Sequence, residues 1–140
     1  AGSFYGDGAN LTNLDTAAKQ FGEATSNGES NKSSTSFSSK VTLNLNNVSS
    51  NSRVFIYYNF DYKVTGGTNN KQCYVQVTGP SFLGGNPEFI TSSPTYSTVH
   101  GLLFCVGSGT SRSYAIQYRK AGGSSAYIRN ARLYALEVGP

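Results

Sequence analysis

The stretch that decides the fold is residues 53–64, Arg-Val-Phe-Ile-Tyr-Tyr-Asn-Phe-Asp-Tyr-Lys-Val. With a period of two, one face of this segment carries Val54, Ile56, Tyr58, Phe60 and Tyr62. Strict alternation over this length is typical of a strand with one face in a core, because successive side chains of a strand point to opposite sides. The stretch therefore predicts a long, half-buried antiparallel strand.

Similar patterns extend to both sides of this strand. Further strands are predicted at residues 36–46, 73–77, 88–91, 96–106, 113–120 and 127–138, with Gly-, Asn- and Ser-rich turns between them. Short strands at this spacing predict an all-β protein, an antiparallel β-sandwich or jelly roll of 7–8 strands. The core is predicted to contain Val41, Leu43, Leu45, Ile56, Tyr58, Phe60, Val75, Val77, Phe104, Ile116 and Leu136.

Composition agrees with one β domain. The chain has 140 residues, of which 13% are charged, and its Tyr and Phe residues (10 and 8) supply a core. These proportions exclude a coiled coil or helical bundle, and no apolar stretch approaches the roughly 18 residues of a membrane span. The net charge is +4, but basic residues stand singly except for Arg119-Lys120, so we expect neither a nucleic-acid nor a membrane partner.

The first part of the chain differs from the rest. Residues 1–33 have few large apolar groups and are predicted to form an N-terminal attachment arm and linker, with the β-sandwich domain at residues 34–140. Asp15 is a candidate N-cap for a short helix over Thr16–Phe21 that ends before Gly22. Residues 26–34 are predicted to be a flexible linker.

Groups able to perform catalysis are scarce. His100 is the single imidazole and is predicted to be a structural or surface residue, and the predicted β domain contains only three acids, Asp61, Glu88 and Glu137. No metal-ligand spacing, phosphate loop or nucleophile motif accompanies them, so we predict a protein that is not an enzyme and has no metal or cofactor. Cys73 and Cys105 lie in predicted strands, either as buried free thiols or as one disulfide.

Two segments resemble proteins of tailed bacteriophages. The segment Phe4-Tyr5-Gly6-Asp7-Gly8-Ala9-Asn10-Leu11-Thr12-Asn13-Leu14 resembles a short element of virion fibre and decoration proteins. The segment from Tyr127 to Val138 is similar to the closing strand of phage β-sandwich domains. The resemblance implies a virion structural protein, a capsid decoration or cement subunit that attaches through its arm to the major capsid protein or another virion protein.

The residues of the arm fit such an attachment. Apolar groups on a polar segment gain most by docking on a partner, which offsets the cost of ordering the segment. The expected attachment residues are Phe4, Tyr5, Asp7, Leu11, Leu14 and Phe21. A homo-oligomer, with a trimer favoured, would add avidity.

Tyrosines on the strands support an alternative function. Their rings offer contact area with a polar handle and can stack on sugars. The rings in question belong to Tyr57, Tyr74, Tyr96, Tyr114, Tyr118, Tyr127 and Tyr134. The alternative is a receptor- or glycan-binding tip module of a phage tail fibre or spike, with a host glycan as its partner.

Overall fold

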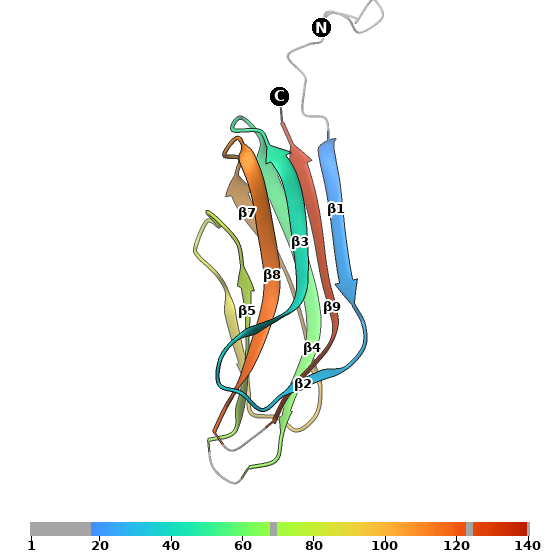
Figure 1. The fold of residues 1–140 in the computed structure, drawn as a ribbon, viewed down its shortest axis with the longest axis vertical. Helices are drawn as coiled ribbons and strands as arrows, with labels where there is room; N and C mark the ends of the chain where they lie inside the picture. Colours follow the sequence, from blue (N-terminus) through green and yellow to red (C-terminus); the bar gives the residue numbers. More distant parts are fainter. Residues whose placement is uncertain (1–17, 68–69, 123–124, 140) are drawn as a thin grey trace, which may run out of the picture.

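A computed structural model describes residues 18–67, 70–122 and 125–139, which form strands joined by turns and loops (Figure 1). The strands are β1 (Ala18–Ser26), β2 (Ser30–Lys32), β3 (Ser38–Val48), β4 (Arg53–Thr65), β5 (Gln72–Thr78), β6 (Glu88–Thr91), β7 (Ser97–Val106), β8 (Thr110–Ala121) and β9 (Ser125–Val138). In this part of the chain no helix is long and apolar enough to cross a membrane.

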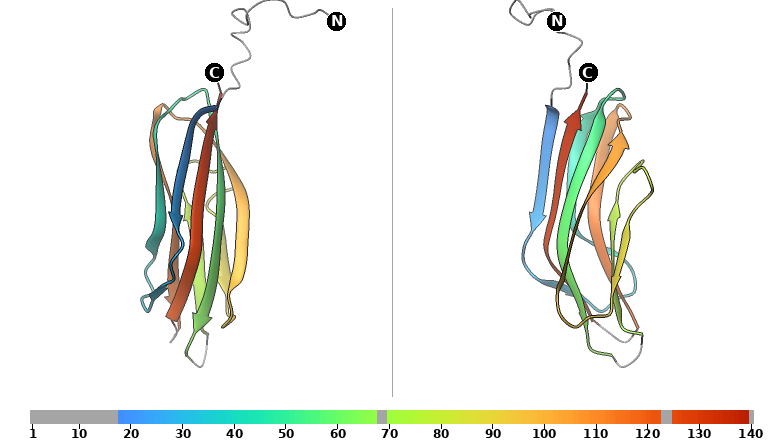
Figure 2. Two further views of the ribbon diagram at one scale, coloured as in Figure 1. Left: turned by 90° about the vertical axis from the view of Figure 1, so that its right-hand side faces the viewer. Right: turned by 180° about the vertical axis from the view of Figure 1, so that it is seen from behind.

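The strands pack as two antiparallel layers, so the predicted β-sandwich is confirmed (Figures 1 and 2). The five-stranded sheet has the order β1-β9-β4-β7, and β2 also pairs with β9. The four-stranded sheet has the order β3-β8-β5-β6. All seven strands predicted from the alternation are present, and β1 and β2 are additional.

The predicted core is confirmed except at two positions. The inward faces of β3, β4, β5, β8 and β9 meet between the sheets, and residues such as Ile56, Phe60 and Ile116 are fully buried there. Phe104 is only half-buried and Leu136 is 37% exposed. Both belong to the outer face of the five-stranded sheet, because both lie opposite Phe55, which alternates with the buried Val54 and Ile56.

The expected helix is wrong in its described part, because Ala18–Phe21 begin strand β1. β1 pairs with β9 along its length, and its Gly22 lets the strand lie close to β3: a Cβ there would be 2.8 Å from Cδ2 of Leu45. Sheet pairing and this close packing outweigh a weak local helix preference. The strand also brings residues 18–26 of the expected arm into the sandwich.

The predicted flexible linker at residues 26–34 is also replaced by ordered structure. Ser30–Lys32 form β2, which pairs with Ala126–Ile128 of β9. The backbone N–H of Asn130 donates to the carbonyl of Asn27 at 3.2 Å, which ties the β1–β2 connection to the same strand. These polar residues resemble a linker in sequence, but they pair with the backbone of β9.

Both cysteines are buried free thiols, one of the two alternatives left open by the sequence. Cys73 lies on β5 and Cys105 on β7, so they belong to different sheets. Burial raises the pKa of Cys73 to about 12. The Cys105 Sγ lies 3.3 Å from the hydroxyl of Tyr114.

Candidate binding site

The outer face of the five-stranded sheet is organised in rows that run across its strands. The antiparallel register places residues of four or three strands side by side in each row. From the end near Ala18 and Val138, the rows are Phe21–Leu136–Phe55–Phe104, Glu23–Tyr134–Tyr57–Leu102, Thr25–Arg132–Asn59–His100 and Arg129–Asp61–Thr98. The face is therefore mainly apolar in its first two rows and polar in the next two.

The first two rows form an apolar patch, defined here by Phe21, Phe55, Tyr57, Leu102, Phe104, Tyr134 and Leu136. Phe21 and Leu102 are 64% and 63% exposed, and Tyr57 is 38% exposed. The rings make contacts with one another: Phe21 stacks on Tyr134 with centroids 6.4 Å apart, and Tyr57 lies 6.1 Å from Tyr134. Aromatic contacts across strands hold these rings in place while leaving part of their surface accessible.

A groove of about 290 Å³ begins at Tyr57 and extends over the polar rows. We call it the central groove. Its lining consists of Tyr57, Asn59, Asp61, Thr98, His100, Asn130 and Arg132. Three neighbouring strands, β4, β7 and β9, supply these side chains, so the groove lies on regular sheet structure rather than on loops.

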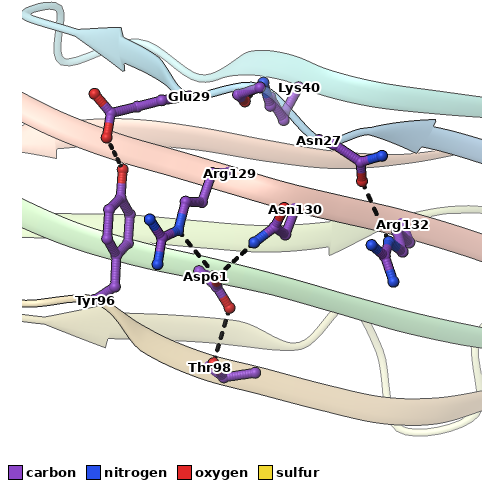
Figure 3. Close-up of polar contacts among 10 residues, drawn as sticks. Asn27, Glu29, Lys40, Asp61, Tyr96, Thr98, Arg129, Asn130 and Arg132 are labelled. Atoms are coloured by element: carbon purple, nitrogen blue, oxygen red, sulfur yellow. Dashed lines mark hydrogen bonds and ion pairs between the residues drawn. The ribbon is translucent and has the colours of Figure 1, made fainter.

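Asp61 lies in the groove and accepts hydrogen bonds from three neighbouring side chains (Figure 3). Its Oδ2 accepts hydrogen bonds from Asn130 Nδ2 at 2.9 Å and from Arg129 Nε at 3.1 Å, and its Oδ1 accepts one from Thr98 Oγ1 at 2.8 Å. Burial alone would raise the pKa of Asp61, but these hydrogen bonds and the charge of Arg129 outweigh it and hold the pKa below its ordinary value. Asp61 is therefore an ionised and well-partnered carboxylate.

A β-bulge in β9 makes this cluster possible. Asn59 lies opposite Arg132 but Asp61 lies opposite Arg129, so two residues of β9, Asn130 and Ala131, face one residue of β4. Asn130 has a left-handed backbone with φ 51°, which asparagine tolerates better than most residues. The bulge turns Arg129 and Asn130 toward the same carboxylate (Figure 3).

Arg132 forms one wall of the groove. Its Nε donates to Oδ1 of Asn27 at 3.3 Å, and Asn27 is itself tied to β9 through its backbone carbonyl (Figure 3). The β1–β2 connection thus fixes the guanidinium from the side of β1. His100, from β7, lies on the opposite side of Asn59 and is exposed.

Next to the Asp61 end of the groove lies a cluster of cations and aromatic rings. The guanidinium of Arg129 lies 3.9 Å from the ring centroid of Tyr96, and the Lys63 ammonium lies 4.5 Å from the same ring and 5.0 Å from that of Tyr127. The Tyr96 hydroxyl donates to the carboxylate of Glu29 (Figure 3). Burial, and then this hydrogen bond and the negative charge of Glu29, raise the pKa of Tyr96. These contacts position the Arg129 guanidinium that pairs with Asp61.

The expected attachment residues are only partly placed by the structure. Phe21 lies in the apolar patch on β1, in contact with Tyr134. The remaining expected residues, Phe4, Tyr5, Asp7, Leu11 and Leu14, lie outside the described residues. From the sequence, Tyr57 is a candidate sugar-stacking ring, Asp61 is one of three acids weighed for catalysis, and His100 is predicted to be a structural or surface residue. The sequence does not point to Asn59, Thr98, Asn130 or Arg132 as binding residues. The available signal was the outward face of the opening stretch, where Tyr57, Asn59 and Asp61 alternate with core residues.

The described ranges contain no group of three His, Cys, Asp or Glu side chains suited to a metal. The groove offers one partnered carboxylate, two carboxamides, a guanidinium, an imidazole, a hydroxyl and a phenol ring. Such a set can donate and accept many hydrogen bonds beside an aromatic surface.

Comparisons with known proteins give a fold likeness alone. No family model matches the chain, and no curated protein matches it. Among solved structures, the chain is similar to one described as "Family 16 Carbohydrate Binding Module-2", with 10% identity and a TM-score of 0.37, over 75% of this chain and 84% of that one. At this TM-score the likeness carries no functional conclusion.

Proposed function

We propose that this protein is a non-catalytic glycan-binding module and that the central groove is its binding site. The observation that carries the proposal is the position of the half-exposed Tyr57 ring at the edge of a groove whose remaining walls are polar side chains on paired strands. This function corresponds to the receptor- or glycan-binding alternative of the sequence analysis. A place at the tip of a phage fibre or spike belongs to the same proposal.

The groove residues match the two kinds of surface that a sugar ring presents. A pyranose presents C–H groups on one face, which pack against an aromatic ring, and hydroxyls on its edge, which need donors and acceptors. Tyr57 supplies the ring, while the amides of Asn59 and Asn130 can both donate and accept. Because the ring is held by Tyr134 and the amide of Asn130 by Asp61, little side-chain entropy is lost on binding.

Binding is favoured over hydrolysis by the state of the carboxylate. Glycosidases use two carboxyl groups that flank the scissile bond, one of them protonated. Asp61 is the acid that lines the groove, and its lowered pKa and three hydrogen bonds suit a structural anion that orders its neighbours. We therefore propose that the protein is not an enzyme.

The test is a screen of the full chain on an array of neutral and acidic oligosaccharides, followed by titration calorimetry. Tyr57→Ala should weaken binding of a hit at least about tenfold, since loss of a central aromatic contact typically costs this much or more. The matched control is Tyr74→Ala, a half-buried tyrosine on β5 of the other sheet, where it lies against Arg119. Equal affinities for the wild type and Tyr57→Ala, or no binding on the array, would refute the proposal.

A virion attachment function is a second candidate, because the apolar patch exposes Phe21 and Leu102 on the surface. These large apolar side chains would gain by burial against the major capsid protein, another virion protein or further copies of the chain. The test is sedimentation of the full chain alone and with assembled heads. Phe21→Ser with Leu102→Ser should abolish a trimer or head binding, and an unchanged sedimentation profile in both settings would exclude this candidate.

A further inference from the structure

We infer that the central groove selects an acidic sugar, of the uronic or sialic acid class, whose carboxylate pairs with Arg132. This inference rests on the proposed glycan-binding function and adds the chemical class of the ligand. It starts from the charged side chains that line the groove, which are Asp61 and Arg132.

The negative charge of the groove is already compensated. Asp61 forms an ion pair with Arg129 and accepts two further hydrogen bonds, and its side chain is only 13% exposed. Arg132 differs, because in residues 18–67, 70–122 and 125–139 no carboxylate pairs with it. The groove is thus left with an excess positive charge, which favours an anionic ligand.

The orientation of Arg132 fits a planar anion. Its Nε donates to Oδ1 of Asn27, which leaves the two terminal nitrogens as donors. A guanidinium presents these N–H groups as a fork that matches the two oxygens of a carboxylate. Since Asn27 is tied to the β-bulge through the N–H of Asn130, the guanidinium is held before the ligand arrives.

The neighbours of Arg132 complete the site. In its row, Asn59 lies opposite Arg132 and His100 lies opposite Asn59, so the three residues stand on adjacent strands. Adjacent strands are about 4.8 Å apart, which places the backbones of Arg132 and His100 about 10 Å from each other. A carboxylate held by Arg132 would leave the sugar ring over Asn59, with its hydroxyls toward His100 and its flat face toward Tyr57 of the next row.

A sulfate ester is the competing anion. A single guanidinium with carboxamide neighbours suits a planar carboxylate of one charge, whereas sulfated glycans are usually held by several cations along the chain. Lys63 lies outside the groove lining, against the rings of Tyr96 and Tyr127. We therefore commit to the carboxylate, and sulfated oligosaccharides form a separate arm of the test.

The experiment uses ligand pairs that differ only in charge. The full chain is titrated with oligogalacturonate and its methyl ester, with sialyllactose and lactose, and with a sulfated galactan oligomer. At least one acidic ligand should bind at least about tenfold more tightly than its neutral counterpart, the size of effect expected for a charge-assisted pair. Higher affinity for the sulfated oligomer than for the carboxylated ligands, or equal affinity for the acidic and neutral members of both pairs, would overturn the inference.

Variants locate the anion. Arg132→Gln should remove the preference for the acidic ligand, so that the acidic and neutral members of each pair bind with equal affinity. Arg132→Lys should restore only part of the preference. Arg119→Gln, on β8 between the rings of Phe37 and Tyr74, is the matched control on the other sheet. If neutral glycans bind and acidic glycans bind no more tightly, this inference alone is refuted. If no glycan binds, the proposed function is refuted as well.

Discussion

Asn130 donates a hydrogen bond from its side-chain amide to Oδ2 of Asp61 at 2.9 Å, across the β4–β9 boundary, from a left-handed backbone with φ 51°. The bulge and the groove therefore both depend on an asparagine at position 130. Asparagine supplies both the amide and the tolerance of positive φ.

Substitutions at Asn130 should separate these two contributions. Asn130→Gly loses the amide but keeps the backbone freedom, and we expect a loss of about 1 kcal/mol in the free energy of unfolding. Asn130→Ala loses both and should cost about 2 kcal/mol, because alanine is strained in this region. Urea unfolding of both variants measures the difference, and equal stabilities would show that the positive φ is not maintained in solution.

Gly107 should be intolerant of any side chain. A Cβ at this position would lie 1.6 Å from the backbone oxygen of Ser49, which a rotamer change cannot relieve. We expect Gly107→Ala to destabilise the protein by about 3 kcal/mol, the upper range of overpacking costs. Gly28→Ala is the matched control, since its Cβ would meet nothing within 4 Å. Similar thermal melting of the two variants would contradict the close approach.

Stability should fall in acid because of Glu137 and Asp61. Burial would raise the pKa of Glu137, but hydrogen bonds from Ser52, Gln20 and the N–H of Ser49 hold it below the ordinary 4.5. A carboxyl whose folded pKa is lowered stabilises the fold above its unfolded pKa and loses this contribution as the pH falls through the folded pKa.

The acid effect can be assigned with one variant. Unfolding free energy should be flat from about pH 7 to 5 and decline below about pH 4.5. Glu137→Gln should be less stable than the wild type near neutral pH and show a shallower decline in acid. An identical slope in the variant would show that Glu137 contributes nothing to the pH dependence.

The thiols should be unreactive in the folded protein. Both are buried, and burial raises the pKa of Cys73 to about 12, so almost no thiolate of Cys73 exists at neutral pH. We expect no modification by a disulfide reagent at pH 7.5 and modification of both cysteines in denaturant. Rapid reaction of Cys73 in the native protein would contradict its burial.

The sequence predicts the sandwich well because core strands carry strict alternation. In β4 every second residue from Val54 to Val64 is buried, as the opening stretch indicates. The alternation does not predict β1 and β2, because they lack a row of large apolar residues on an inward face. Their strand conformation depends on pairing with β9 rather than on their own pattern.

The groove was harder to foresee for a different reason. Its residues come from three strands that are distant in sequence, and the register between β4 and β9 changes at the bulge. One signal was present: the buried positions of β9 change from even numbers (Ala126, Ile128) to odd numbers (Ala131, Leu133). Such a change of phase indicates an extra residue in the strand, which is how Arg129 and Asn130 come to face Asp61.

The most direct test of the proposed binding site is a nuclear magnetic resonance titration of the isotope-labelled full chain with an oligosaccharide that binds. We expect the largest chemical-shift changes at Tyr57, Asn59, His100 and Arg132, on the outer face of the five-stranded sheet. Changes centred instead on Tyr74 and Gln117, on the four-stranded sheet, or no changes at millimolar sugar, would contradict it.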